Sequence, residues 1–239
     1  MSLGESRLRV VSLLPDLLGT YGDGGNARIL ERRLAWRGIP CELVTVRVGT
    51  PVPAGGDLYV LGGGEDEAQL AALVMLRTSA FVAAVERGAH VLAVCAGLQL
   101  LGRSLMGPDG QCHEGLGIID ARTDRLKKRA VGEVVARLPG EPDLGLLTGF
   151  ENHAGRTQLG PGLQPLSRVL KGTGNGSVPR VDGARTHRVL ATYLHGPVLA
   201  RNPQLADLAL ERVLGTALAP LHHDAHDQLR RQLLKGRAP

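Results

Sequence analysis

The first half of the chain alternates short apolar runs with longer stretches in which apolar residues follow helical spacing. The runs are rich in β-branched residues, as is typical of buried strands, and each is followed by a turn or a helix. They are Arg7 to Leu14, Cys41 to Val48, Leu58 to Leu61 and His90 to Val94. Predicted helices lie near Asn26 to Arg37 and from GGGEDE to Gly88. This order predicts βα units on a parallel sheet.

The second half has a different pattern. From about Gly115 strand-like segments dominate, and glycine-rich turns separate them. These segments predict a mixed or antiparallel extension of the sheet. Two helices close the chain, near Pro203 to Leu214 and Asp224 to Leu234. Without an internal repeat or a low-complexity linker, residues 1–239 are expected to form a single α/β domain.

Composition supports an intracellular globular protein. A hydrophobic content of 43% suffices for one sizeable core. The sequence contains neither an apolar run long enough to span a membrane nor a secretory cleavage pattern. Its three cysteines, Cys41, Cys95 and Cys112, include no close pair, which indicates a reducing compartment. We expect a cytoplasmic protein.

The net charge of +5 reflects interspersed charges, apart from one basic cluster. That cluster comprises Arg125, Lys127, Lys128 and Arg129. Only three tyrosines, two phenylalanines and one tryptophan are available to stack on bases, so no nucleic-acid partner is expected. The cluster suits a solvated face, an anionic substrate or an acidic partner surface, and charge alone does not separate these.

Cys95 stands at the end of a predicted strand, in HVLAVCAGLQLLG, where a helical pattern resumes at once. A nucleophile elbow has this arrangement. The sulfur then projects from the sheet edge, and backbone N–H groups of the new helix favour its thiolate form. Ala96 N–H would be the first oxyanion donor, and Gly63 or Gly64 would supply a second. The alternative is a small buried hydrophobe, the commonest fate of a free cysteine.

His195 ends the apolar run in ATYLHGP and is followed by Gly196 and Pro197. It should therefore emerge at a strand terminus, where either a catalytic base or an ordinary turn residue would fit. A cysteine activated by a histidine is the equipment for acyl transfer through a thioester. Cys41 and Cys112 lack the elbow context, so structural or incidental roles are expected for them.

These residues resemble the class I glutamine amidotransferases, whose elbow C-x-G-x-Q is matched by Cys95, Gly97 and Gln99. GFENHAGRT at Gly149 to Thr157 and the segment TYLHGP resemble signatures of the cobyric acid synthase branch. YGDGGN at Tyr21 to Asn26 resembles the free-standing GatD branch, the glutaminase subunits of lipid II isoglutaminyl synthases. The resemblance implies a flavodoxin-like α/β fold with a central, mostly parallel sheet, an antiparallel extension and flanking helices.

The resemblance also implies an activity and a partner. Cys95 would attack the side-chain amide of L-glutamine, His195 would protonate the departing ammonia, and water would hydrolyse the glutamyl thioester. No phosphate-binding loop G-x-x-x-x-G-K-[ST] occurs, so no cofactor is expected in this subunit, with ATP and Mg on the partner. In the family, that partner is a Mur ligase-like subunit, MurT, which amidates the D-glutamate of lipid II to D-isoglutamine. A heterodimer is therefore expected.

The resemblance assigns Arg129 to the substrate α-carboxylate, which a guanidinium can clamp with two parallel hydrogen bonds. Gln99 would contact substrate or cap the elbow helix. Pro197 stands where many class I enzymes carry an acid, so the site would work as a dyad or use an acid from elsewhere. We expect the partner to supply that acid, with little glutaminase activity in the isolated chain; Glu151 is the internal candidate, and its neighbours Asn152 and His153 would support the site.

Alternative functions are an amidotransferase for another acceptor, a γ-glutamyl hydrolase with the same elbow chemistry, and a dinucleotide-binding module. GDGGNA at Gly22 to Ala27 fits G-x-G-x-x-A, but several residues separate it from the preceding strand, unlike the true fingerprint. A cluster near the end of the chain suggests a metal site: His222, His223, Asp224 and His226. His222 and His226 could share one helical face, but no third ligand is well placed beside them, so no metal is predicted.

Overall fold

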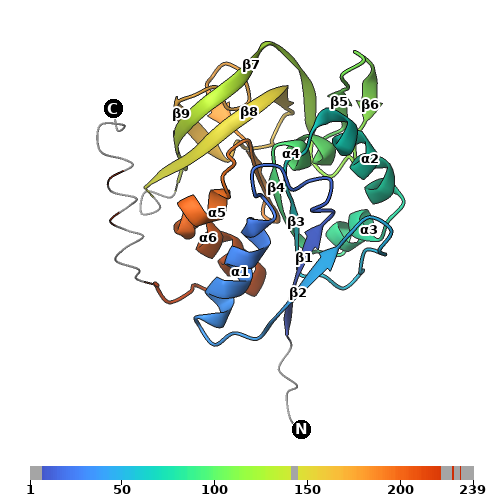
Figure 1. Ribbon diagram of the computed structural model, residues 1–239. Coiled ribbons are helices and arrows are strands. Elements are labelled where there is room, and N and C mark those ends of the chain that lie inside the picture. The colour runs from blue at the N-terminus through green and yellow to red at the C-terminus, as the bar shows by residue number, and fades with distance from the viewer. Residues whose placement is uncertain (1–6, 141–144, 222–227, 229–231, 233–239) are drawn as a thin grey trace.

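The computed structural model describes residues 7–140, 145–221, 228 and 232. Its centre is a six-stranded sheet with the order β11-β12-β4-β3-β1-β2 (Figure 1). The last five strands in this order run parallel, and only the short β11 pairs antiparallel with β12. The bounds are β1 Leu8–Leu13, β2 Cys41–Val46, β3 Leu58–Leu61, β4 His90–Val94, β11 Ala184–Arg185 and β12 Val189–Thr192.

Helices lie on both sides of this sheet, which is why its inner strands are largely apolar and show no regular alternation of apolar and polar residues. In Figure 1, α1, α5 and α6 lie on one side of the sheet and α2 and α3 on the other. Every residue of β3 and β12 is buried. The bounds are α1 Gly25–Ala35, α2 Asp66–Arg77, α3 Phe81–Glu86, α4 Ala96–Leu101, α5 Val198–Arg201 and α6 Pro203–Leu214. Within the described ranges, no helix has the length and apolar character that crossing a bilayer requires.

Most elements of the first half match the sequence prediction, with one correction. The helix expected to run on to Gly88 is two helices, α2 and α3, because the chain turns at Thr78–Ala80. The hydroxyl of Ser79 donates to the Leu76 carbonyl at 2.8 Å and accepts the Phe81 N–H at 3.2 Å. Serine competes in this way for the backbone groups that a continuous helix would use. The last predicted helix, Asp224 to Leu234, lies outside the described residues apart from isolated positions.

A second sheet holds the strands between residues 104 and 182, in the order β10-β9-β7-β5-β6 with β8 on β7. From the sequence, these strands were expected to extend the first sheet, whereas they pair with one another and form a separate sheet. The core of the second sheet is the long antiparallel hairpin of β7 and β8. The bounds are β5 Ser104–Met106, β6 Cys112–Glu114, β7 Ala121–Arg137, β8 Leu146–Leu159, β9 Ser167–Lys171 and β10 Val181–Asp182.

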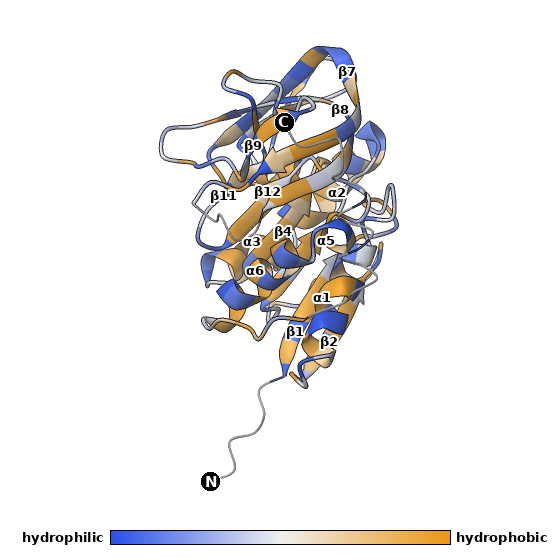
Figure 2. Ribbon diagram, turned by 90° about the vertical axis from the view of Figure 1, so that its left-hand side faces the viewer, coloured by the Kyte–Doolittle hydropathy of each residue, from blue (hydrophilic) through white to orange (hydrophobic). Residues whose placement is uncertain are grey.

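The hairpin lies directly against the carboxyl edge of the first sheet, and two glycines of β8 permit this approach. A Cβ on Gly149 would lie 2.5 Å from the Leu194 Cβ, and one on Gly155 would lie 2.6 Å from the Tyr193 hydroxyl. Phe150 of β8 and His195, which follows β12, form an isolated antiparallel bridge that links the hairpin to the first sheet. Figure 2 shows largely apolar strands in the first sheet and polar segments along β7 and β8 above it.

Candidate active site

Cys95 forms a sharp turn between β4 and α4. Its φ of 51° is positive, which a non-glycine residue adopts at a cost and which is typical of nucleophile elbows. The Cys95 N–H donates to the Thr192 carbonyl of β12 at 2.8 Å, which anchors the turn to the sheet. Gly97 lets α4 pack tightly, since a Cβ there would lie 2.8 Å from the Leu61 Cβ of β3. The predicted elbow is therefore present.

His195 follows β12, the strand beside β4, and both strands end at the same sheet edge. Its ring Nδ1 lies 2.7 Å from Oδ2 of Asp23, and both side chains are at most 1% exposed. The same Asp23 oxygen accepts the Gly63 N–H at 2.9 Å. Nε2, on the other side of the ring, is buried and makes no hydrogen bond with any described residue. Since Nδ1 is engaged, Nε2 is the nitrogen available for proton transfer.

The protonation of His195 depends on both neighbours. Burial by itself favours the neutral ring, but the hydrogen bond with Asp23 and the interaction with Cys95 outweigh it and raise the pKa of His195 to about 10. The imidazole is therefore protonated at neutral pH. A positive ring beside the sulfur stabilises a thiolate, which is the nucleophilic form of cysteine.

The acid beside His195 is one that the sequence analysis did not assign. The expected sources were the partner subunit and, within the chain, Glu151, whereas Asp23 occupies the position. Asp23 lies 172 residues before His195, so no local spacing links the two. The only signal was the YGDGGN segment, which the family resemblance singled out without giving its aspartate a role.

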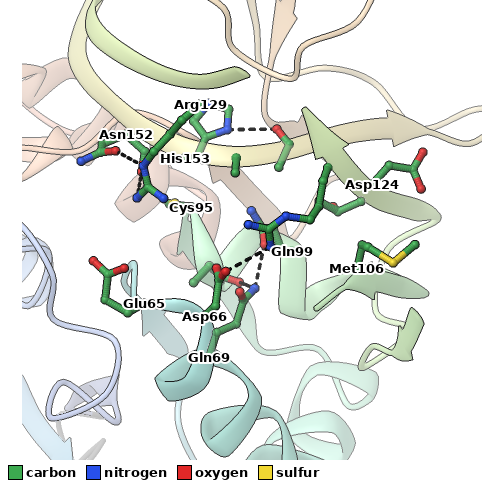
Figure 3. A pocket seen from close by; sticks show the side chains of 16 residues that line it. Glu65, Asp66, Gln69, Cys95, Gln99, Met106, Asp124, Arg129, Asn152 and His153 are labelled. Atoms are coloured by element: carbon green, nitrogen blue, oxygen red, sulfur yellow. Dashed lines mark hydrogen bonds and ion pairs between the residues drawn. The ribbon is translucent and has the colours of Figure 1, made fainter. Parts of the chain in front are cut away.

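A polar pocket opens beside Cys95 and extends under β7 and β8 (Figure 3). Arg129 and Asn152 lie at its rim: the Arg129 Nε donates to the Asn152 side-chain oxygen at 2.5 Å, and the Asn152 amide donates to the Tyr21 hydroxyl. Arg129 reaches the pocket from a bulge, because β7 residues 126–129 oppose only Ala154 of β8. A bulge redirects side chains from the regular pleat. Arg129, which was predicted to bind the substrate α-carboxylate, therefore lies at the pocket. Its partner Asn152 is 23 residues away in sequence.

Comparison with known proteins identifies the family. The model of the CobB/CobQ-like glutamine amidotransferase domain matches residues 9–203. The chain belongs to this family. It is 34% identical to "Lipid II isoglutaminyl synthase (glutamine-hydrolyzing) subunit GatD" of Staphylococcus aureus (strain N315), over 86% of this chain and 84% of that protein. The protein of the same name from Streptococcus pneumoniae (strain ATCC BAA-255 / R6) is 31% identical over 89% and 81%, respectively.

A solved glutamine amidotransferase shares the fold with a TM-score of 0.58 and 22% sequence identity, covering 85% of this chain and 98% of that one. The predicted fold class, that of the class I glutamine amidotransferases, is thereby confirmed. The chain is a glutamine amidotransferase. Its elbow cysteine lines the pocket, and His195 follows the strand that pairs with the one ending at the elbow.

Of the backbone groups expected to bind an oxyanion in this amidotransferase, the Gly63 N–H is already taken by Asp23. The neighbouring Gly97 N–H, which was not among the expected donors, is also engaged, because it donates to the Gly62 carbonyl at 3.1 Å. Ala96 and Gly64 line the pocket together with Cys95. Gly63 and Gly64 were the alternatives for the second donor, and because the Gly63 N–H is engaged, the geometry favours Gly64 together with Ala96.

Gln99 lines the pocket, but its amide already has partners at both ends. The oxygen accepts from the Gln69 side chain at 2.8 Å, and the nitrogen donates to the Tyr193 hydroxyl at 3.2 Å (Figure 3 draws the first bond). Tyr193 continues the network to Thr157 at 2.7 Å. Burial raises the pKa of Tyr193, so it remains a neutral hydroxyl. These contacts favour the second predicted role of Gln99, support of the elbow helix.

Glu151 and His153 are both buried in β8, but of the two only His153 lines the pocket beside Cys95. The Glu151 carboxylate accepts the N–H groups of Thr173 and Gly174 at 2.8 and 2.9 Å, so it holds the turn after β9. His153 lines the pocket, stacks on Tyr193 with ring centroids 3.8 Å apart, and contacts the Gly155 carbonyl through Nδ1. Glu151 is therefore not the acid that orients His195.

Two further sequence hypotheses concern other sites. The four-residue cluster His222, His223, Asp224 and His226 lies outside the described residues. Within the described part of the chain, no three side chains gather as metal ligands would. The GDGGNA segment, read above as a weak dinucleotide fingerprint, turns Asp23 inward against His195, which differs from a loop that wraps a pyrophosphate.

Proposed function

We propose that this amidotransferase is a glutaminase subunit that hydrolyses L-glutamine in the cytoplasm and delivers ammonia to a Mur ligase-like partner. The partner, with ATP and Mg, would amidate the D-glutamate of lipid II to D-isoglutamine. The names of the two relatives support the acceptor and the existence of a second subunit. The observation that carries the glutaminase reaction is the position of His195, held by Asp23 through Nδ1 with Nε2 available, just beyond the strand that pairs with the one ending at Cys95.

The first half-reaction forms a thioester. The Cys95 thiolate attacks the side-chain carbonyl carbon of glutamine, and the oxygen takes up negative charge beside the N–H groups of Ala96 and Gly64. His195 gives its Nε2 proton to the amide nitrogen as the carbon–nitrogen bond breaks. Ammonia leaves, and a γ-glutamyl thioester remains on Cys95 with a neutral imidazole beside it.

The second half-reaction consumes one water. The neutral His195 takes a proton from the water that attacks the thioester carbon, the carbon–sulfur bond breaks, and glutamate leaves. The thiolate and the imidazolium are restored. Arg129 would hold the α-carboxylate of the substrate throughout, because its guanidinium already lies at the pocket rim with Asn152.

The reaction is tested by measuring glutamate release from L-glutamine, with and without the Mur ligase-like subunit encoded by the same organism. The variant Cys95→Ser should lose about 10⁴-fold or more of the turnover, because the nucleophile acts as a unit with its base. The matched control is Cys112→Ser, at an exposed cysteine of β6, which should retain full activity.

Three results would overturn parts of the proposal. Turnover that survives Cys95→Ser would refute the thioester mechanism. Faster cleavage of γ-glutamyl peptides than of glutamine would favour a γ-glutamyl hydrolase. A complex that uses glutamine and ATP but leaves lipid II unamidated, while it amidates a different carboxylate, would refute the acceptor alone.

A further inference from the structure

The contacts of Asp23 call for a charged side chain. One carboxylate oxygen accepts from both His195 and Gly63, whereas the other, Oδ1, is buried without a hydrogen-bond partner among the described residues. Burying a carboxylate with one oxygen unsatisfied costs free energy, and an asparagine oxygen would serve the same two donors without burying a charge. A negative charge at 0% exposure is justified where it balances a positive ring.

The loop that carries Asp23 fits the segment after His195. A Cβ on Gly25 would lie 2.8 Å from the Pro197 Cγ, so Gly25 allows α1 to begin against this proline. Pro197 is the position at which many class I enzymes carry their acid. In this chain the proline forms a packing surface for the loop, and the loop supplies the carboxylate instead.

Backbone geometry fixes the same loop from the other side. The Thr20 N–H donates to the Gly63 carbonyl at 3.1 Å, while Asp23 receives the Gly63 N–H. Gly63 permits this close contact, because a Cβ there would lie 2.4 Å from the His195 Cε1. One carboxylate thus sets both the orientation of the imidazole and the position of the strand-end loop that holds Gly64.

We infer that Asp23 is the positioning residue of this active site, which makes the set of reacting and orienting groups complete within one chain. The inference rests on the proposed glutaminase function and deepens it. Asp23 holds a proton on Nδ1 of His195, directs Nε2 at the sulfur, and stabilises the imidazolium. The partner is then not required to contribute an acid to the site.

The decisive variant is Asp23→Asn in the full chain, assayed alone and with the Mur ligase-like subunit. It keeps the size of the side chain but removes the charge, so kcat for glutamine hydrolysis should fall about 10²- to 10⁴-fold with KM nearly unchanged. Asp23→Glu should restore part of kcat. The control is Asp16→Asn, in the same connection after β1, whose side chain faces Arg47 and the Val48 N–H. It should leave kcat unchanged.

A pH profile separates positioning from a merely structural effect. The groups that face His195 are Asp23, Cys95 and the Tyr21 ring, with Asp182 also acting on it electrostatically. Without the Asp23 charge the imidazolium is less stable and loses its proton at lower pH, so the alkaline limit of kcat/KM should move at least one pH unit lower. An unchanged alkaline limit in a folded Asp23→Asn variant would refute the inference.

Two outcomes keep this test distinct from that of the reaction itself. If Cys95→Ser abolishes turnover while Asp23→Asn retains both rate and pH limits, the glutaminase function stands and the role of Asp23 falls. If Asp23→Asn does not fold, NMR titration of the His195 ring in the wild-type chain decides the question. A ring that titrates near the ordinary histidine value would refute the inference, and one that stays protonated well above neutral pH would support it.

Discussion

The two sheets contribute differently to the site. The parallel sheet places Cys95 directly after β4 and His195 shortly after the adjacent strand β12, where a bridge to Phe150 of β8 also holds it. The hairpin of the second sheet supplies Arg129 and Asn152, from a bulge in β7 and from the facing strand β8. The reacting groups thus follow strands of the parallel sheet, whereas the groups that would recognise the substrate lie at an irregular part of the hairpin.

This difference suggests a division of labour. Bond making needs atoms held within a narrow geometry, which buried parallel strands provide. Substrate recognition tolerates side chains that are more exposed, and Arg129 is one of them. Changes in the first sheet should therefore reduce the rate of the chemical step, whereas changes at the bulge should reduce affinity.

Among the variants that test this division, Arg129→Ala is expected to have the largest effect on glutamine hydrolysis. Loss of the guanidinium should raise KM for glutamine about 10- to 100-fold with a smaller change in kcat, because a carboxylate contact persists through the reaction. Lys128→Ala is the control in the same bulge and should have little effect. Steady-state kinetics of glutamate release measure both constants. A fall in kcat with KM unchanged would place Arg129 with the reacting groups instead.

The sequence predicts the parallel sheet better than the site as a whole, and particular residues explain why. Buried strands such as Leu58–Leu61 form uninterrupted apolar runs, and Cys95 follows such a run directly. Asp23 was missed because its partner His195 is distant in sequence and nothing local marks the pair. Gly149 and Gly155 appear in the recognised signature, yet only the folded chain shows that they bring β8 against the segment carrying His195.

A smaller effect on turnover is expected for Glu151→Gln, which tests whether the buried acid of the second sheet supports structure. Burial raises the pKa of this carboxyl, but hydrogen bonds with His153 and the N–H groups of Gly174 and Thr173 outweigh it and lower the pKa. The stability that this carboxylate contributes is thus present above its unfolded pKa and lost as pH falls through the folded value. The variant should lose about 1–3 kcal/mol of unfolding free energy near neutral pH and retain kcat within a few-fold.

Chemical denaturation and kinetics on the same preparation check this expectation for Glu151. The control is Glu86→Gln, which removes a carboxylate at the end of α3, a helix that flanks the first sheet away from β8 (Figure 1). Glu86→Gln should change neither the unfolding free energy nor kcat. A Glu151→Gln variant of normal stability with a strongly reduced kcat would instead assign the glutamate to the reaction.

The smallest effect on turnover is expected for Asp182→Asn, where the two sheets meet. Asp182 of β10 accepts the Thr192 hydroxyl at 2.6 Å and the Tyr193 N–H at 3.0 Å, and burial raises its pKa to about 7 despite these hydrogen bonds. The folded state therefore holds a proton that the unfolded chain releases near the ordinary aspartate value. Stability must then decline as pH rises from about 4 to about 7. Asparagine does not titrate, so the variant lacks this pH-dependent loss of stability. Unfolding free energies measured from pH 4.5 to 8 should therefore show the variant becoming more stable relative to the wild type as pH rises. Parallel curves would show that Asp182 stays charged in the fold.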